Sequence, residues 1–211
     1  MISEDSDMDY KRYDVVVIPP PDVAEQAMSM SRTLSSFGSF FVLDGVARHP
    51  HLSLYRVPLY ESVLPEVVES IEKLAHTTAP FLLTQGTYYP DQGVWIGVRY
   101  IADKSLFNLH TFFIDALKKY RVIEDDTRYA ERWSEMSKEQ RNNIQECGWA
   151  NSYTLYSPHI SFTKLKQPRA DVLAHLPQRE FSFIVDHVGL YELGQHGTAD
   201  ILIADFWLAG K

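Results

Sequence analysis

Two short segments carry the same pair of side chains with acid–base potential. His51-Leu52-Ser53 and His159-Ile160-Ser161 each place a histidine two residues before a serine, within a run typical of a strand. Successive side chains of a strand point to opposite faces, so each histidine shares a face with its serine. Apolar residues alternate with them. Each strand is therefore expected to bury one face and to present an imidazole and a hydroxyl on the other.

Two such faces suit the cleavage of a phosphodiester bond. One base must activate the nucleophile and one acid must protonate the leaving oxygen, and histidine, with a pKa near 6.5, can do either near neutrality. Serine hydroxyls can stabilise charge that builds on phosphorus. We therefore predict that His51 and His159 are catalytic and that Ser53 and Ser161 bind phosphate across one cleft. The scheme needs no metal or cofactor, so activity should survive a chelator and show a bell-shaped pH profile near neutrality.

Four further residues are candidates for contact with the substrate. Strict alternation places Tyr55 on the face of the first motif and Thr163 on the face of the second. Tyr88 and Tyr191 occupy matched places, in Gly86-Thr87-Tyr88 and Gly189-Leu190-Tyr191. A base or sugar could stack on these two tyrosines, although packing in the core explains them equally well.

The other histidines favour structural interpretations. His49 and His51 form a His-x-His pair that could bind a metal, but the sequence offers no nearby cluster with a third ligand. His196 flanks the last predicted hairpin and is expected in an exposed turn. His110 is expected on the surface of a helix.

The two motifs together resemble the twin His-x-[Ser/Thr]-x signature of the 2H phosphoesterase superfamily. This group includes 2′-5′ RNA ligase and RNA 2′,3′-cyclic phosphodiesterase-like proteins, and the similarity extends from the strand at Val15 to the strand at Trp207. The resemblance implies metal-free chemistry on 2′,3′-cyclic phosphates or 2′-5′ linkages. Lys164 stands where such proteins often carry a basic residue, which implies a phosphate contact. Strict alternation, however, turns Lys164 away from the cleft.

The order of predicted elements repeats along the chain. Each half contains a strand, a helix, a His-x-Ser strand, a second helix and a hairpin. The repeat predicts two copies of one α+β unit, and the resemblance implies a bilobal α+β fold with two antiparallel sheets flanking a central cleft. Helices are expected outside. The expected strands are 13–18, 40–45, 51–57, 81–89, 94–100, 156–165, 180–193 and 199–208, and the expected helices are 22–38, 61–75, 106–117 and 170–175.

We expect one domain, 1–211, made of two pseudo-symmetric lobes. The highly charged stretch 125–148 is expected to be a helical insertion that stops at Gly148, because it has no counterpart in the other half. The acidic segment 1–10 is expected to be a mobile leader.

The composition limits the partners of the protein. A net charge of −8 and the lack of a basic stripe argue against a long nucleic acid, so a small phosphorylated nucleotide or an RNA terminus is expected. No apolar run is long enough for a membrane span. Cys147 is the single cysteine, which predicts a packed thiol and a reducing, cytoplasmic location. The oligomeric state stays open.

These observations favour a hydrolase of the cyclic phosphodiesterase type. The alternative is a non-catalytic nucleotide- or RNA-binding module with the same fold, although intact histidines in both motifs favour the enzyme. A ligase-like RNA processor is disfavoured by the negative charge.

Overall fold

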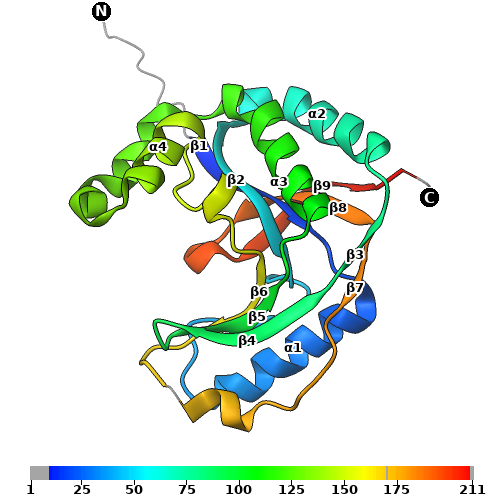
Figure 1. Ribbon diagram of the computed structural model, residues 1–211, viewed down its shortest axis with the longest axis vertical. Coiled ribbons are helices and arrows are strands. Elements are labelled where there is room, and N and C mark those ends of the chain that lie inside the picture. The colour runs from blue at the N-terminus through cyan, green and yellow to red at the C-terminus, as the bar shows by residue number, and fades with distance from the viewer. Residues whose placement is uncertain (1–9, 170, 210–211) are drawn as a thin grey trace, which may run out of the picture.

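The computed structural model describes residues 10–169 and 171–209, and it confirms the α+β class (Figure 1). Residues 1–9 of the expected leader lie outside the described residues, and Tyr10 begins the first strand. The strands are β1 (Tyr10–Val17), β2 (Leu52–Tyr60), β3 (Phe81–Leu83), β4 (Gln85–Asp91), β5 (Trp95–Tyr100), β6 (His159–Lys164), β7 (Phe183–Val185), β8 (His187–Leu193) and β9 (Ala199–Trp207). The helices are α1 (Pro21–Ser35), α2 (Leu64–Thr77), α3 (Lys104–Leu117) and α4 (Lys138–Cys147). The 3₁₀ segments are η1 (Glu61–Val63), η2 (Lys118–Tyr120), η3 (Ile123–Glu135), η4 (Tyr153–Leu155), η5 (Asp171–His175) and η6 (Gln195–Gly197).

The two motif strands are neighbours at the centre of one antiparallel sheet. Its seven strands run in the order β4-β5-β6-β2-β1-β8-β9. A single residue pair, Leu52 with Ile160, joins β2 to β6, and both side chains are fully buried. This pairing differs from the expected pair of equivalent sheets, because the two halves of the sheet are fused at that point. The duplication into two lobes stays a prediction.

Two expected strands take other forms. The run 180–193 is divided, because β7 pairs with β3 in a separate two-stranded sheet while β8 pairs with β1 and β9. The strand expected at 40–45 is absent from the structure, which has irregular backbone there. Side chains take the place of a partner strand there: Leu43 N–H donates to Ser31 Oγ, and the carbonyl oxygen of Phe41 accepts from Thr163 Oγ1. The Asp44 carboxylate then accepts from three backbone N–H groups and closes the turn that follows.

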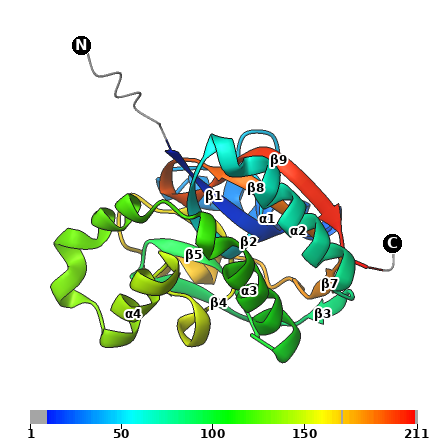
Figure 2. The same ribbon diagram turned by 90° about the horizontal axis from the view of Figure 1, so that it is seen from above.

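Helices cover the apolar side of the central strands. α1 packs against β6, α3 packs against β2, and α2 packs against β9 and α3 (Figures 1 and 2). In β6, Ile160 and Phe162 are fully buried beneath this layer, whereas His159 and Ser161 are only partly buried. The helices therefore fix the strands from one side and leave the motif side chains on the other. No helix in 10–169 or 171–209 is long and apolar enough to cross a membrane.

The segment from η3 to α4 has a small core of its own. Ser137 and Gln140 form a capping box that begins α4, and Gly148, with a φ of +78°, ends it. Met136, Ile144 and Ala150 form a buried cluster that is separate from the main core. This segment lies at one edge of the molecule, beside β1 and β2 (Figure 1).

Candidate active site

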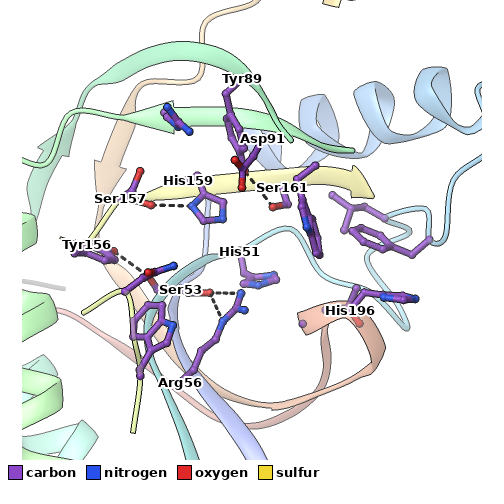
Figure 3. Close-up of a pocket in the computed structure, with 18 of the residues that line it drawn as sticks. His51, Ser53, Arg56, Tyr89, Asp91, Tyr156, Ser157, His159, Ser161 and His196 are labelled. Carbon is purple, nitrogen blue, oxygen red and sulfur yellow. Dashed lines mark hydrogen bonds between the residues drawn. The ribbon is translucent and has the colours of Figure 1, made fainter. Parts of the chain in front are cut away.

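Both motifs open onto one cavity of about 450 Å³. His51, Ser53, His159 and Ser161 line it, and Figure 3 shows the two imidazoles turned toward the same space between the strands. The sequence therefore identified four residues that the fold brings together. The other principal lining residues are Arg56, Tyr89, Asp91, Trp95, Arg99, Arg132, Trp149, Asn151, Tyr156 and His196.

The two histidines are held in the same way. His51 Nδ1 lies 2.9 Å from the carbonyl oxygen of His49, and His159 Nδ1 lies 2.8 Å from that of Ser157. A carbonyl can only accept a hydrogen bond, so each Nδ1 must carry the proton. In the neutral ring, Nε2 is then left with a lone pair. Each motif therefore fixes both the tautomer and the orientation of its imidazole.

Burial lowers the pKa of both imidazoles. The pKa of His159 falls to about 4, first through burial and further through the positive charges of Arg56 and Arg99. Burial also lowers the pKa of His51, but the carboxylate of Asp14 opposes that effect. The surroundings therefore favour the neutral form of both rings, and His51 is the ring whose protonated form is stabilised by a nearby carboxylate.

A β-bulge in β2 changes which residues reach the cavity. Val15 pairs with Tyr55 and Val16 pairs with Ser53, so Leu54 is an extra residue in β2. Beyond the bulge the alternation is reversed. The expected cleft position of Tyr55 is therefore wrong: its side chain is fully buried and its hydroxyl donates a 2.6 Å hydrogen bond to the carbonyl oxygen of Cys147.

The same bulge brings Arg56 to the face of Ser53. Asp14 is fully buried on the neighbouring strand, and its Oδ2 accepts hydrogen bonds from Ser53 Oγ at 2.6 Å and from Arg56 Nε at 3.1 Å. Arg56 Nη2 in turn donates to Ser53 Oγ at 3.0 Å. Ser53 thus donates its only O–H hydrogen to Asp14. Of these three residues, Arg56 is therefore the one with a partly exposed side chain and N–H groups to donate.

β6 contains a matching bulge. Gly97 pairs with Ser161 and Ile96 pairs with Thr163, so Phe162 is the extra residue. Thr163 is consequently buried and donates to the carbonyl oxygen of Phe41, which contradicts its expected place in the cleft.

The bulge also moves Lys164. Strict alternation would turn this residue away, but the bulge returns it to the side of Ser161, opposite Trp95. Its ammonium lies 5.2 Å from the centre of the Trp95 ring and 5.4 Å from that of Phe40. Lys164 does not line the cavity but lies behind Trp95, which does.

Tyr89 occupies the place in the site that was expected for Tyr88. Tyr88 pairs with Val98 on the buried face and hydrogen-bonds the backbone at Arg179. Of the two interpretations left open for Tyr88, the structure therefore supports packing against the core rather than stacking on a ligand. Tyr89 lies opposite Gly97, whose missing side chain lets the ring approach Ser161. The hydroxyl of Tyr89 lies 3.3 Å from Ser161 Oγ, and burial raises the pKa of this phenol to about 12, so it stays protonated.

Tyr191 is buried in a small cluster with Val16 and Ala199 and does not line the cavity, so packing is the one of its two open interpretations that the structure supports. Two other expectations need correction. His196 is not a plain exposed turn residue, because it lines the cavity from the 3₁₀ turn before β9. His110 is fully buried: Nδ1 bonds the carbonyl oxygen of Leu54 at 2.6 Å, and burial lowers its pKa to about 4.

The cavity is more basic than the chain as a whole. Arg56, Arg99 and Arg132 line it, while Asp91 is the acidic residue among its lining groups. One sequence signal could have revealed part of this set, since a charged residue within an apolar strand, as at Arg56, must be paired or functional.

In the described part of the chain, no group of three or more His, Cys, Asp or Glu residues could hold a metal, so the His49–His51 pair lacks a third ligand there.

Solved structures share this fold along nearly the whole chain. TT0787 of Thermus thermophilus has a TM-score of 0.59 at 19% identity, over 95% of this chain and 99% of that one. E. coli LigT complexed with phosphate has a TM-score of 0.58 at 12% identity, over 95% and 98%. A structure described as a phosphoesterase gives 0.54 at 15% identity, over 95% and 99%. LigT was also solved with 3′-AMP, and that structure matches with a TM-score of 0.54 at 14% identity, over 95% and 99%.

The chain therefore shares the fold of LigT and of the structure described as a phosphoesterase, in agreement with the fold expected from the resemblance. No protein-family model matches the chain, and no curated protein matches it in sequence.

Proposed function

We propose that this protein is a phosphoesterase that hydrolyses a 2′,3′-cyclic phosphate or a 2′-5′ phosphodiester in a small nucleotide or RNA end. The observation that carries this proposal is the matched pair of imidazoles on one cavity, each with Nδ1 bonded to the carbonyl two residues earlier. That arrangement leaves both Nε2 atoms available for proton transfer. Phosphate and 3′-AMP in the LigT structures support a phosphorylated nucleotide as the ligand class.

The two histidines have different roles in this mechanism. His159 Nε2, neutral because of burial and nearby arginines, takes a proton from water, whose oxygen then attacks phosphorus. His51, close to the negative charge of Asp14, gives a proton from Nε2 to the ribose oxygen as its bond to phosphorus breaks. The products are a phosphomonoester and a free hydroxyl, and solvent restores the two protonation states.

Arg56 and Ser161 stabilise the negative charge on the phosphoryl oxygens. Arg56 is anchored by the buried Asp14, so its guanidinium is already oriented when phosphate arrives. Ser161 can accept from the Tyr89 hydroxyl and then direct its own proton to the ligand. In this scheme Ser53 positions Arg56 rather than binding phosphate itself, and Lys164 adds positive potential from behind Trp95.

Turnover of cyclic nucleotides tests the proposal. Purified protein in excess EDTA is incubated with each of the four nucleoside 2′,3′-cyclic phosphates and with a 2′-5′-linked dinucleotide, and the monoester products are separated by chromatography. We expect hydrolysis of at least one substrate, with none in a control that carries His51→Ala and His159→Ala together. Binding of these compounds without any turnover would instead establish the non-catalytic binding module.

The pH dependence of activity follows from the pKa values of the free site. kcat/KM rises with pH as the base loses its proton and falls as the acid loses its own. Because burial lowers the pKa of both histidines below 6.5, we expect the maximum of kcat/KM on the acidic side of pH 6.5 rather than at neutrality. A profile from pH 4 to 9 in buffers of constant ionic strength measures it. A maximum above pH 7 would contradict the assigned environment of the two rings.

A further inference from the structure

A second cavity, of about 360 Å³, adjoins the first. The two cavities share Arg56, Trp149, His196 and Gly197 in their linings. Nothing in the proposed mechanism uses the remainder of the second cavity, where Arg12 and Arg128 are the charged groups. The two cavities are therefore neighbours, with Arg56 at their boundary.

The arginines of the second cavity are held in place by a buried carboxylate. Asp125 has a fully buried side chain, and its Oδ1 accepts from Arg12 Nε at 2.9 Å and Nη2 at 2.8 Å. Its Oδ2 pairs with Arg128. Arg128 also donates to the carbonyl oxygen of Gly148 at 2.6 Å and lies over the ring of Tyr129. The same arrangement occurs at Asp14 and Arg56, where a buried carboxylate orients a guanidinium group that faces a cavity.

The charge of this cavity favours an anion. Among the described residues, three arginines line it and no carboxylate does; Asp14 and Asp125 lie behind the arginines, and the carboxylate of Asp200 lies behind Gly194. The side chains of Arg12, Arg56 and Arg128 keep 50%, 33% and 22% of their surface exposed. Guanidinium groups that are fixed in advance and still accessible are suited to phosphate oxygens.

A glycine lets Arg56 reach the boundary between the two cavities. Gly197 has a φ of +69°, and a Cβ atom built on it would lie 2.9 Å from Arg56 Nη1. A side chain there would displace the guanidinium. Arg56 is thus placed where it can contact a group in either cavity.

We propose that the second cavity is a subsite for a second phosphate of the substrate. This inference rests on the proposed function and specifies its substrate class: a nucleoside 2′,3′-cyclic phosphate with another phosphate on its 5′ side. The reacting phosphate lies between the histidines, the second phosphate lies against Arg12 and Arg128, and the nucleoside that joins them lies along Trp149. The second phosphate is either a terminal 5′-phosphate or the next phosphodiester of an RNA end.

Three substrates and three protein forms test this subsite. The substrates are adenosine 2′,3′-cyclic phosphate, its 5′-phosphorylated form, and a dinucleotide with a 5′-hydroxyl that ends in the same cyclic phosphate. The proteins are the wild type, Arg12→Gln, and the control Arg32→Gln, which removes the same charge from α1, away from both cavities. We expect Arg12→Gln to lower kcat/KM about 10-fold for a substrate with a second phosphate and less than about 2-fold for the plain cyclic nucleotide. Arg32→Gln should change neither value.

The outcomes separate the subsite from the proposed function. A loss with the 5′-phosphorylated mononucleotide alone identifies a terminal phosphate, and a loss with the dinucleotide identifies a phosphodiester. If wild-type protein hydrolyses all three substrates equally and Arg12→Gln loses nothing, the subsite is wrong while the proposed function stands. If no substrate is hydrolysed, calorimetric binding of adenosine 3′,5′-bisphosphate and of 3′-AMP still tests the subsite. Arg12→Gln should then weaken the bisphosphate alone, and equal effects on both ligands would overturn the inference.

Discussion

Alanine in place of His51 or His159 is expected to lower kcat/KM for a cyclic nucleotide by roughly 10²–10⁴-fold, because each change removes one partner of general acid–base catalysis. The double variant should lose little more than the worse single variant, since the two rings serve one proton-transfer cycle. Steady-state kinetics of the three variants measure both effects. Folding should be retained, because these rings lie on the cavity rather than in the apolar core.

His76→Ala is the matched control for this experiment. His76 lies on the exposed side of α2, so its loss should leave kcat/KM unchanged. Nucleotide affinity should fall only modestly in the two motif variants, because Arg56 and Ser161 remain to hold phosphate. Full activity in either motif variant would remove that histidine from the mechanism.

Arg56→Met is expected to lower both activity and stability. Loss of a preorganised donor to the phosphoryl oxygens should reduce kcat/KM by roughly 10²–10³-fold. The change also leaves Asp14 fully buried without its cation, which should lower the free energy of unfolding by about 3 kcal/mol. Urea unfolding and steady-state kinetics measure the two losses separately.

The double variant Asp14→Asn with Arg56→Met separates the two roles of this pair. Removing the buried charge should restore most of the lost stability, because an amide costs less to bury than an unpaired carboxylate. Activity should not return, since no guanidinium faces the phosphate. If activity recovers together with stability, Arg56 has a structural role only.

The limits of the sequence-based predictions coincide with the bulges. Alternation placed Ser53 and Ser161 correctly on the cavity, because the strand is regular from each histidine to its serine. It failed for Tyr55 and Thr163, one residue beyond each bulge. A bulge depends on how two strands pair, which the alternating pattern of either strand alone does not reveal. The two bulges also bring the basic residue that stands three positions after each serine, Arg56 or Lys164, to the same side of the strand as that serine.

The rest of the site depends on contacts between distant segments. Trp149 and Arg132 come from the segment around α4, and His196 comes from the turn before β9. Nothing in their local sequence marks them, because their place depends on how those segments pack on the sheet. Asp14 is different, because a carboxylate directly before the apolar run Val15-Val16-Val17 indicates a charge that must be paired when the strand is buried. In the structure its partner is Arg56 of β2.

The separate small core beneath the η3–α4 segment has an evolutionary consequence. Met136, Ile144 and Ala150 hold this segment together, while the histidines depend on the central sheet. Arg128, Arg132 and Trp149 line the cavities from this segment, so under the proposed function substitutions at these three positions are expected to change the choice of ligand more than the proton transfer between the histidines. Selection for a new substrate and selection for catalytic power would act on largely different residues. We therefore expect a lineage with this architecture to change its specificity first through residues of this segment.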